Sequence, residues 1–254
     1  VGLQDLWKAF TPVKEAKYWY FNAYVGLFFF IPLLNHAIRS ITGREAVFAM
    51  AGIFLLVLWL PHTRLSEVFL LANGYSALWL VILYAMGGLM ARFELPARLP
   101  AKFWALGYLL AVLGSFVPRM ALLHMQPELW TPENQNLSMQ YINLCVILAG
   151  ICLVGLFSRL ELPEKLVRIT KALSPHAFGV YLCHTHTLIF LTAIRNQFQW
   201  LGTAPIWELL AVTLGATVFI YAVGSAADWL LTKLMTLGLT EKEAEEQIVN
   251  GFLK

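Results

Sequence analysis

The amino-acid sequence predicts an all-α protein that lies in a membrane as a bundle of about seven transmembrane helices. Of its 254 residues, 59% are hydrophobic and only 13% are charged. Soluble domains carry about 25% charged residues, so this chain has too few charges to cover a surface exposed to water. Long apolar runs alternate with short polar or basic connections, and each run is a candidate span. The expected surroundings are therefore a lipid bilayer.

The composition also excludes several classes of site. Three cysteines, Cys145, Cys152 and Cys183, lie inside apolar runs. An odd number of thiols in such positions gives neither a disulfide framework nor the spacing of a metal site. No glycine-rich phosphate loop and no nucleic-acid motif is present. We therefore expect no metal and no nucleic-acid partner.

The expected spans follow from the apolar runs and from the residues that end them. Aromatic rings at Tyr18–Tyr20 open the first span, where amphipathic rings suit the headgroup level. Pro118 is expected to stop or kink the fourth span. Ser174 and Pro175 form a helix-start signal for the sixth. The seven expected spans are residues 18–38, 46–60, 73–92, 103–117, 139–157, 174–194 and 206–231.

The connections differ in character. Residues 120–138 form the longest polar connection, and both a substrate-binding lid and a plain connector fit its composition. Residues 159–171 form a short amphipathic segment whose polar side carries four basic residues. We expect residues 1–239 to form one membrane domain and residues 240–254 to form a helical tail capped by Thr240.

The basic residues predict the orientation. Of the 18 Lys and Arg residues, 12 fall on the face that includes the tail and 6 fall on the other. Because the richer face is normally cytoplasmic, the tail is expected inside the cell and Val1 outside. An outside start without a signal sequence predicts that an odd number of spans precedes this region.

Two histidines, His184 and His186, lie near the middle of the sixth apolar run. Ionisable groups at that depth are energetically costly and are functional by default. The alternative is that each ring donates a hydrogen bond to a carbonyl of a neighbouring helix and has only a packing role. Residues two apart on a helix point about 200° apart, so both rings cannot face one pocket. We favour His184 as the catalytic base and His186 as its support. His176 is expected to start a helix, and Asp228 to be paired or solvated.

Three segments resemble the acyltransferase-3 family of bacterial membrane proteins. Residues 18–27 (YWYFNAYVGL), followed by Pro32–Asn35, resemble that family's aromatic "YWF…AYxGLYLLSPFLN" helix. Residues 178–186 (FGVYLCHTH) resemble its "FGVYLIHDHP" helix, and residues 73–79 with 84–87 resemble its "NGYSLLWFxxLYLIG" segment. Thr185 and Thr187 replace the acidic residue and the proline of the family pattern.

The resemblance implies an integral membrane O-acyltransferase in the cytoplasmic membrane of a bacterium. Such proteins take an acyl group, usually acetyl, from cytosolic acyl-CoA and transfer it to a sugar hydroxyl of a surface or exported polysaccharide. The family also carries further spans ahead of this region, and the first of them holds an arginine and a histidine usually assigned to catalysis. This chain is therefore expected to lack part of that active site.

Two sets of residues are candidates for binding the substrates. Aromatic rings near the outer ends of the spans could stack on the sugar acceptor, although an interfacial aromatic belt explains them equally well. This acceptor set is Tyr18, Trp19, Tyr24, Asn73, Tyr75 and Trp79. Cytoplasmic basic residues could bind the CoA phosphates. The excess of Lys and Arg that is normal on the cytoplasmic face of a membrane protein already accounts for such charges. This donor set is Arg159, Lys165, Arg168 and Lys171.

Two other functions remain open at this stage. A transporter or flippase for a polysaccharide intermediate would favour discontinuous helices and an inverted repeat, and no repeat is evident in the sequence. A scaffold without catalytic activity is the third interpretation.

Overall fold

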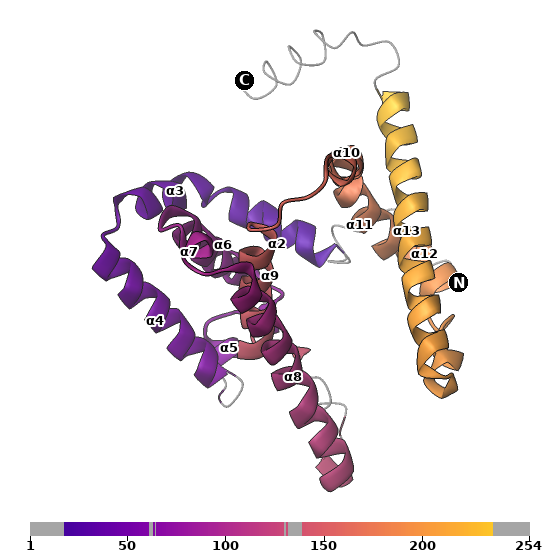
Figure 1. Ribbon diagram of the computed structural model, residues 1–254, viewed down its shortest axis with the longest axis horizontal. Coiled ribbons are helices and arrows are strands. Elements are labelled where there is room, and N and C mark those ends of the chain that lie inside the picture. Colours follow the sequence, from indigo (N-terminus) through magenta and orange to yellow (C-terminus); the bar gives the residue numbers. More distant parts are fainter. Residues whose placement is uncertain (1–17, 61–62, 64, 130, 132–138, 236–254) are drawn as a thin grey trace. The chain divides into compact units, whose positions relative to one another are not determined.

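The computed structural model describes residues 18–60, 63, 65–129, 131 and 139–235, and every regular element within them is a helix (Figure 1). The all-α expectation is confirmed for these residues. The chain divides into two compact units, one of residues 19–161 and one whose described residues are 18 and 162–235. Each unit is described by itself. The expected tail over 240–254 lies outside the described residues.

Candidate membrane spans are fewer than the sequence predicts. Helices α8 (Ala101–Met125) and α13 (Ile206–Met235) are each long and apolar enough to cross a membrane. Two more spans result if bent pairs are counted, namely α2 (Trp19–Phe28) with α3 (Ile31–Ser40) and Glu164–Thr185 with Thr187–Ile194. The described residues thus hold two to four candidate spans. The expected number of about seven is not confirmed.

The first expected span is bent rather than continuous. Helices α2 and α3 meet at an angle of 59°. Pro32 lies in the first turn of α3, where its missing N–H leaves no hydrogen bond unmade. In a continuous helix the same proline would lose a bond to Phe28 and its ring would press on the Phe28 carbonyl. The run therefore breaks at Phe29 and Phe30.

Helix α4 (Gly43–Trp59) begins at a capping box. The Glu45 N–H donates to Thr42 Oγ1 at 3.4 Å, and the Thr42 N–H donates to the Glu45 carboxylate at 2.8 Å. These bonds supply partners that the first turn of a helix otherwise lacks. Donation from the Thr42 backbone and then from its hydroxyl holds the pKa of Glu45 below its ordinary value. The second helix therefore starts before the expected Ala46.

The core of the 19–161 unit forms between α4, α6 (Ala77–Arg92) and α9 (Leu144–Phe157). Trp79 is 1% exposed and Leu71 is fully buried. The other members of the core cluster are Val57, Leu60, Met86, Ile142 and Ile147. Short elements complete this unit: α5 (Leu65–Val68), η2 (Ala72–Gly74), α7 (Leu95–Arg98) and η3 (Pro127–Leu129).

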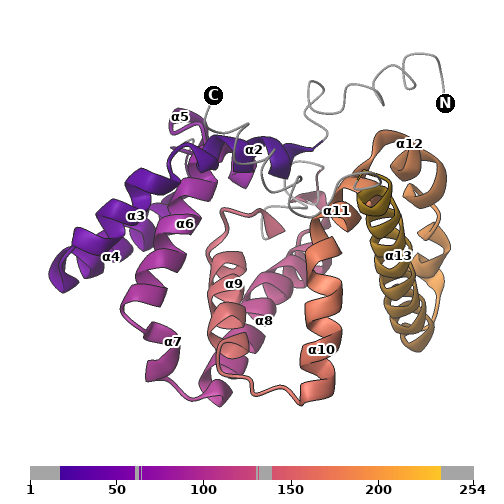
Figure 2. The same cartoon turned by 90° about the horizontal axis from the view of Figure 1, so that it is seen from above.

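Helices α8 and α9 lie side by side and contact each other through small residues (Figures 1 and 2). A Cβ placed on Gly107 would lie 2.8 Å from Cys152 Sγ, and one placed on Gly114 would lie 2.9 Å from Cys145 Sγ. The glycines are seven residues apart, and so are the cysteines. Each thiol therefore occupies the space that a side chain on the facing glycine would need, and this lets the two backbones approach closely.

Gly155 offers a direct test of this contact. A Cβ at Gly155 would overlap the Trp104 indole, whereas one at Gly150 in the same helix meets nothing within 4 Å. We expect Gly155→Ala to destabilise the protein by about 1–3 kcal/mol through overpacking. Gly150→Ala should leave the stability unchanged or raise it by about 0.5–1 kcal/mol. Thermal unfolding of both variants in nanodiscs measures the difference, and equal melting temperatures would contradict the contact.

The fourth helix differs from its expected bounds. Helix α8 passes through Pro118 and ends at Met125, so the proline does not stop it. Membrane helices tolerate proline because neighbouring groups can satisfy the freed carbonyl. Part of the expected 120–138 connection is consequently helical, and residues 130 and 132–138 of that connection lie outside the described residues.

The second unit begins with an amphipathic helix. Helix α10 (Glu164–Leu173) forms from the segment expected at 159–171, and η5 (Ser174–His176) joins it to α11 (Ala177–Thr185). Then follow α12 (Thr187–Ile189), a π-helical turn η6 (Phe190–Ile194) and a 3-10 helix η7 (Gln199–Thr203). Helix α13 extends to Met235, past the expected Leu231. Helix α11 packs against α13 (Figure 2).

Candidate functional site

The sixth expected span breaks at His186. Helix α11 ends at Thr185, His186 has φ −58° and ψ 133°, and the two helical parts meet at 60°. The continuous span expected over 174–194 is therefore wrong. The Thr185 hydroxyl donates to the Tyr181 carbonyl at 2.6 Å, a local bond that competes with regular helix and often bends it. Irregular backbone within a bilayer is tolerated only against protein or a water-filled cavity, so the break is a candidate site.

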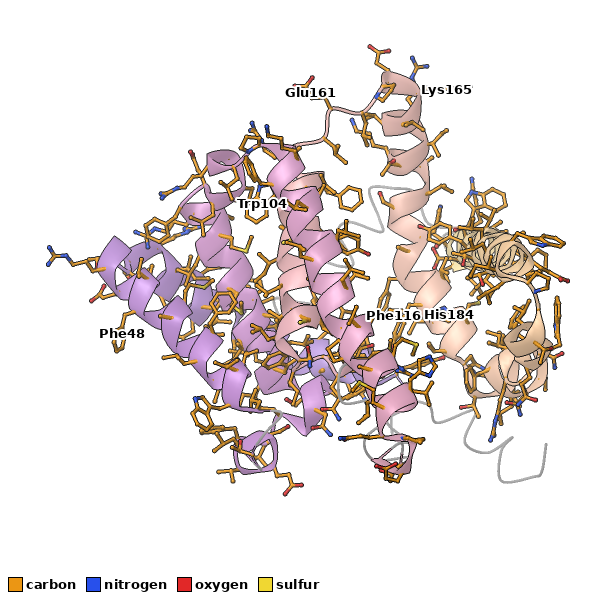
Figure 3. The ribbon with its side chains drawn as sticks, turned by 60° about the horizontal axis from the view of Figure 1, so that its bottom comes forward. Phe48, Trp104, Phe116, Glu161, Lys165 and His184 are labelled. Carbon is orange, nitrogen blue, oxygen red and sulfur yellow. The ribbon has the colours of Figure 1, made fainter. Side chains whose placement is uncertain are left out.

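His184 is oriented by its own helix. Its Nδ1 lies 2.7 Å from the Val180 carbonyl oxygen, and the ring is half-buried with its centroid 6.2 Å from that of Tyr181 (Figure 3). A carbonyl can only accept a hydrogen bond, so Nδ1 of neutral His184 carries the proton. Nε2 then holds a lone pair. This tautomer is the one that a general base requires.

The relation between the two histidines differs from the expectation. His186 lies beyond the end of α11, so the 200° separation expected for two positions on one helix does not apply. Beside it, the Thr187 side chain is 7% exposed, and its Oγ1 has no hydrogen-bond partner among the described residues. Because buried hydroxyls normally have a hydrogen-bond partner, Thr187 is a candidate site residue beside the break.

A histidine and an aspartate outside the predicted set join α11 to α13. His176 Nδ1 lies 2.7 Å from Asp228 Oδ2, and both side chains are less than one-third exposed. A Cβ on Gly179 would overlap the same carboxylate, so the glycine lets Asp228 reach across the helix pair. The signal that could have found the pair is Asp228 itself, because a carboxylate inside an apolar run needs a partner.

The aromatic acceptor set is only partly brought together. The ring centroids of Trp19 and Tyr75 lie 4.6 Å apart. Tyr24 stacks on Tyr20 instead, and Trp79 is buried in the core. Tyr18 belongs to the other unit, where its ring contacts that of Tyr181. Asn73 lies in the turn before Tyr75, where its N–H donates to Ser66 Oγ at 3.1 Å. Tyr141, which was not predicted, completes the Trp19–Tyr75 contact.

The basic donor set is split between the two units. Arg159 lines a cavity of about 350 Å³ together with Ser158 and Glu94. Lys165, Arg168 and Lys171 lie on α10, where the exposed Arg168 contacts Glu164 at 3.3 Å. Within the 19–161 unit, a second cavity of about 390 Å³ is lined by Arg39 and by Tyr84 and Asn35, whose side chains share a hydrogen bond of 2.8 Å. Both cavities include Gly87, and both offer a cation to a phosphate.

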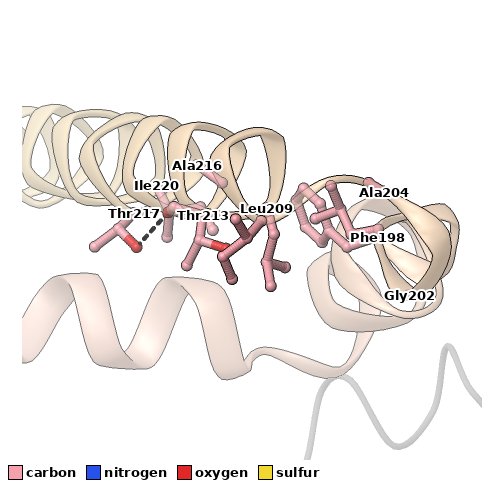
Figure 4. Close-up of a pocket in the computed structure, with 10 residues that line it drawn as sticks. Phe198, Gly202, Ala204, Leu209, Thr213, Ala216, Thr217 and Ile220 are labelled. Atoms are coloured by element: carbon pink, nitrogen blue, oxygen red, sulfur yellow. Dashed lines mark hydrogen bonds between the residues drawn. The ribbon is translucent and has the colours of Figure 1, made fainter.

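A larger cavity of about 600 Å³ lies between η7 and the first half of α13 (Figure 4). Its walls are largely apolar, and its polar side chains are Thr213 and Thr217, the second of which donates to the Thr213 carbonyl at 2.8 Å. Among the described residues that line this cavity there is no histidine, carboxylate, lysine or cysteine, so they offer no group for acid–base catalysis. Among the described residues no cluster of three metal-ligating side chains forms.

Comparisons with known proteins agree with the order of the sequence motifs. The family model for the acyltransferase-3 domain, described as an acyltransferase domain, matches residues 7–225. That range covers most of the chain, including the helix break at His186 and the Trp19–Tyr75 contact. Neither the comparison with curated proteins nor the one with solved structures gives a significant match.

Proposed function

Because the chain belongs to the acyltransferase-3 family of membrane acyltransferases, we propose that it is an O-acyltransferase for cell-surface or exported polysaccharide. The donor is acyl-CoA, with acetyl the expected group, and the acceptor is a sugar hydroxyl. The membrane is the cytoplasmic membrane of a bacterium, with the C-terminus inside. The family match over residues 7–225 carries this proposal, and the orientation of His184 supports it.

The proposed reaction needs a base and a donor to the oxyanion. The acceptor oxygen attacks the thioester carbonyl carbon while His184 Nε2 takes the hydroxyl proton. The Thr187 hydroxyl is the proposed donor to the tetrahedral oxyanion. Collapse of the intermediate breaks the C–S bond, and the proton passes from His184 to the departing CoA sulfur. The products are an O-acyl ester and free CoA.

Other residues have supporting roles in the proposal. His186, at the helix break, is the proposed support of His184. The His176–Asp228 pair positions α11, which carries His184. The proposed contacts to the CoA phosphates on the cytoplasmic side are Lys165, Arg168 and Lys171 on α10, and separately Arg159 in the 19–161 unit. Of the expected acceptor set, Trp19 and Tyr75 are the proposed acceptor contacts, because only these two are brought together with exposed ring surface.

One experiment tests the function directly. The full chain in nanodiscs, given labelled acetyl-CoA and cell-envelope polysaccharide from the bacterium in which it occurs, should give labelled glycan. Mild alkali should release the label as acetate, because the product is an ester. Reactions without polysaccharide are the control. Folded protein that transfers no label would count against the proposal.

A second candidate function rests on the two bent helix pairs, at 59° and 60°. Discontinuous helices are typical of transporters, in which they flank the substrate near the middle of the bilayer. Movement of a lipid-linked oligosaccharide across vesicles that contain the protein but no acyl-CoA would favour a flippase. Dependence of any product on acyl-CoA would favour the transferase.

A further inference from the structure

Three aromatic residues from separate parts of the chain form one cluster in the 19–161 unit. The ring centroids of Trp19 and Tyr141 lie 5.5 Å apart, and those of Tyr75 and Tyr141 lie 5.1 Å apart. With the Trp19–Tyr75 distance of 4.6 Å, every ring contacts the other two. Tyr75 is 50% exposed and Tyr141 is 43% exposed, so the cluster presents ring surface outward. We call these three residues the aromatic platform.

The turn that carries Tyr75 is strained. Leu70, Ala72 and Asn73 have φ between 49° and 53°, and Gly74 has φ 98°. For residues other than glycine this left-handed conformation is unfavourable and persists only where surrounding contacts enforce it. Here the buried Ser66 hydroxyl accepts from the Asn73 N–H and donates to its side-chain oxygen, while Leu71 is fully buried in the core.

Gly74 explains why Tyr141 can join the cluster. A Cβ on Gly74 would overlap the Tyr141 Cβ, so only glycine allows this approach. The strained turn thus fixes Tyr75, and its glycine admits Tyr141. Backbone strain of this kind gathers at sites that must be held in one geometry before a ligand arrives. A general belt of interfacial aromatic residues has no such requirement.

The seven-span topology expected from the sequence would place the platform on the same side as an acceptor outside the cytoplasm. Trp19 starts α2, Tyr75 precedes α6 and Tyr141 precedes α9. In the topology expected from the basic residues, each of these helices enters the membrane from the outer face. A pyranose ring has one face of C–H groups and an edge of hydroxyls. Aromatic ring faces can stack on the C–H face, and the tyrosine hydroxyls can form hydrogen bonds with the sugar hydroxyls.

We propose that Trp19, Tyr75 and Tyr141 are a preformed stacking subsite for one sugar ring of the carbohydrate acceptor. This inference rests on the proposed transferase function and adds Tyr141 as a substrate-binding residue. The platform supplies no acid or base, so its contribution is to bind and orient the acceptor. Its removal should therefore affect the KM for the acceptor rather than kcat at saturation.

Steady-state kinetics of the full chain in nanodiscs test the subsite, with oligosaccharides prepared from the acceptor polysaccharide as the varied substrate. We expect Tyr141→Ala and Tyr75→Ala each to raise the acceptor KM by about 3- to 10-fold, in the range of stacking on one aromatic ring. The KM for acetyl-CoA should stay within about twofold of wild type. Tyr141→Phe keeps the ring and should retain most of the affinity.

Trp207→Ala is the matched control, because Trp207 starts α13 on the same expected face and is 68% exposed outside the platform. An unchanged acceptor KM in Tyr141→Ala overturns the proposal. An equal rise in Trp207→Ala would overturn it in favour of interfacial anchoring. If the wild-type protein transfers no label, a direct measurement of oligosaccharide binding separates the stacking subsite from the transferase function. Binding that Tyr141→Ala weakens keeps the subsite while the transferase function fails, and no binding by wild type rejects the subsite.

Discussion

Replacing His184 with alanine is expected to lower kcat for acyl transfer by about 10²–10⁴-fold, the usual contribution of a general base. The reason lies in the Nδ1 contact with the Val180 carbonyl, which leaves Nε2 to accept the acceptor proton. The protein should still fold, because the half-buried ring makes only a local bond within α11. Initial rates with labelled acetyl-CoA, together with a melting temperature for each variant, give the measurement.

Two further substitutions separate catalysis from packing. His184→Asn places an amide nitrogen near Nδ1 and keeps a donor for the Val180 carbonyl, but it offers no base. It should melt like wild type and be as inactive as the alanine variant. His186→Gln should retain more activity than either, since His186 has a supporting role. Full activity in His184→Asn would remove His184 from the reaction.

Gly179→Ala should cause the second large effect. The added Cβ would overlap the Asp228 carboxylate and displace it from His176, so the α11–α13 contact must open. Overpacking of this kind costs about 1–3 kcal/mol, and misplacement of His184 should reduce activity as well. Unfolding and transfer rates measured on the same preparations report both losses.

Gly215→Ala is the matched control for this substitution. Gly215 lies on α13, and a Cβ there meets nothing within 4 Å. The change should preserve activity and add about 0.5–1 kcal/mol of stability, because alanine favours a helix over glycine. If Gly179→Ala behaves like Gly215→Ala, then the His176–Asp228 pair does not set the position of α11.

The helices themselves were largely predictable, and their interruptions were not. The apolar runs located α13 within a few residues. Such runs reflect composition, so they do not show where a helix changes direction. The break at His186 occurs inside a run that was expected to form one span, and Thr187 stands where the family pattern quoted above has a helix-breaking proline. The bend before Pro32 was open to prediction from that residue alone.

The candidate site was predictable where its residues are close in sequence. His184 was found because it lies in a motif, and Trp19 and Tyr75 because they mark the ends of apolar runs. The His176–Asp228 pair joins positions 52 residues apart, so the sequence could indicate that Asp228 needs a partner but not that His176 is that partner. Tyr141 was missed because it borders the longest polar connection, where an aromatic residue is unremarkable until the turn at Gly74 is seen.

The glycine–cysteine contacts between α8 and α9 limit sliding of one helix along the other. A slide of one turn would bring the two sulfurs opposite Phe103 and Leu110 in one direction, or opposite Ala111 and Pro118 in the other. Each shift sets both sulfurs against side chains larger than that of glycine. The α8–α9 pair is therefore expected to keep its register. A change of shape in the 19–161 unit is more easily made at the bend before Pro32 than by sliding between these two helices.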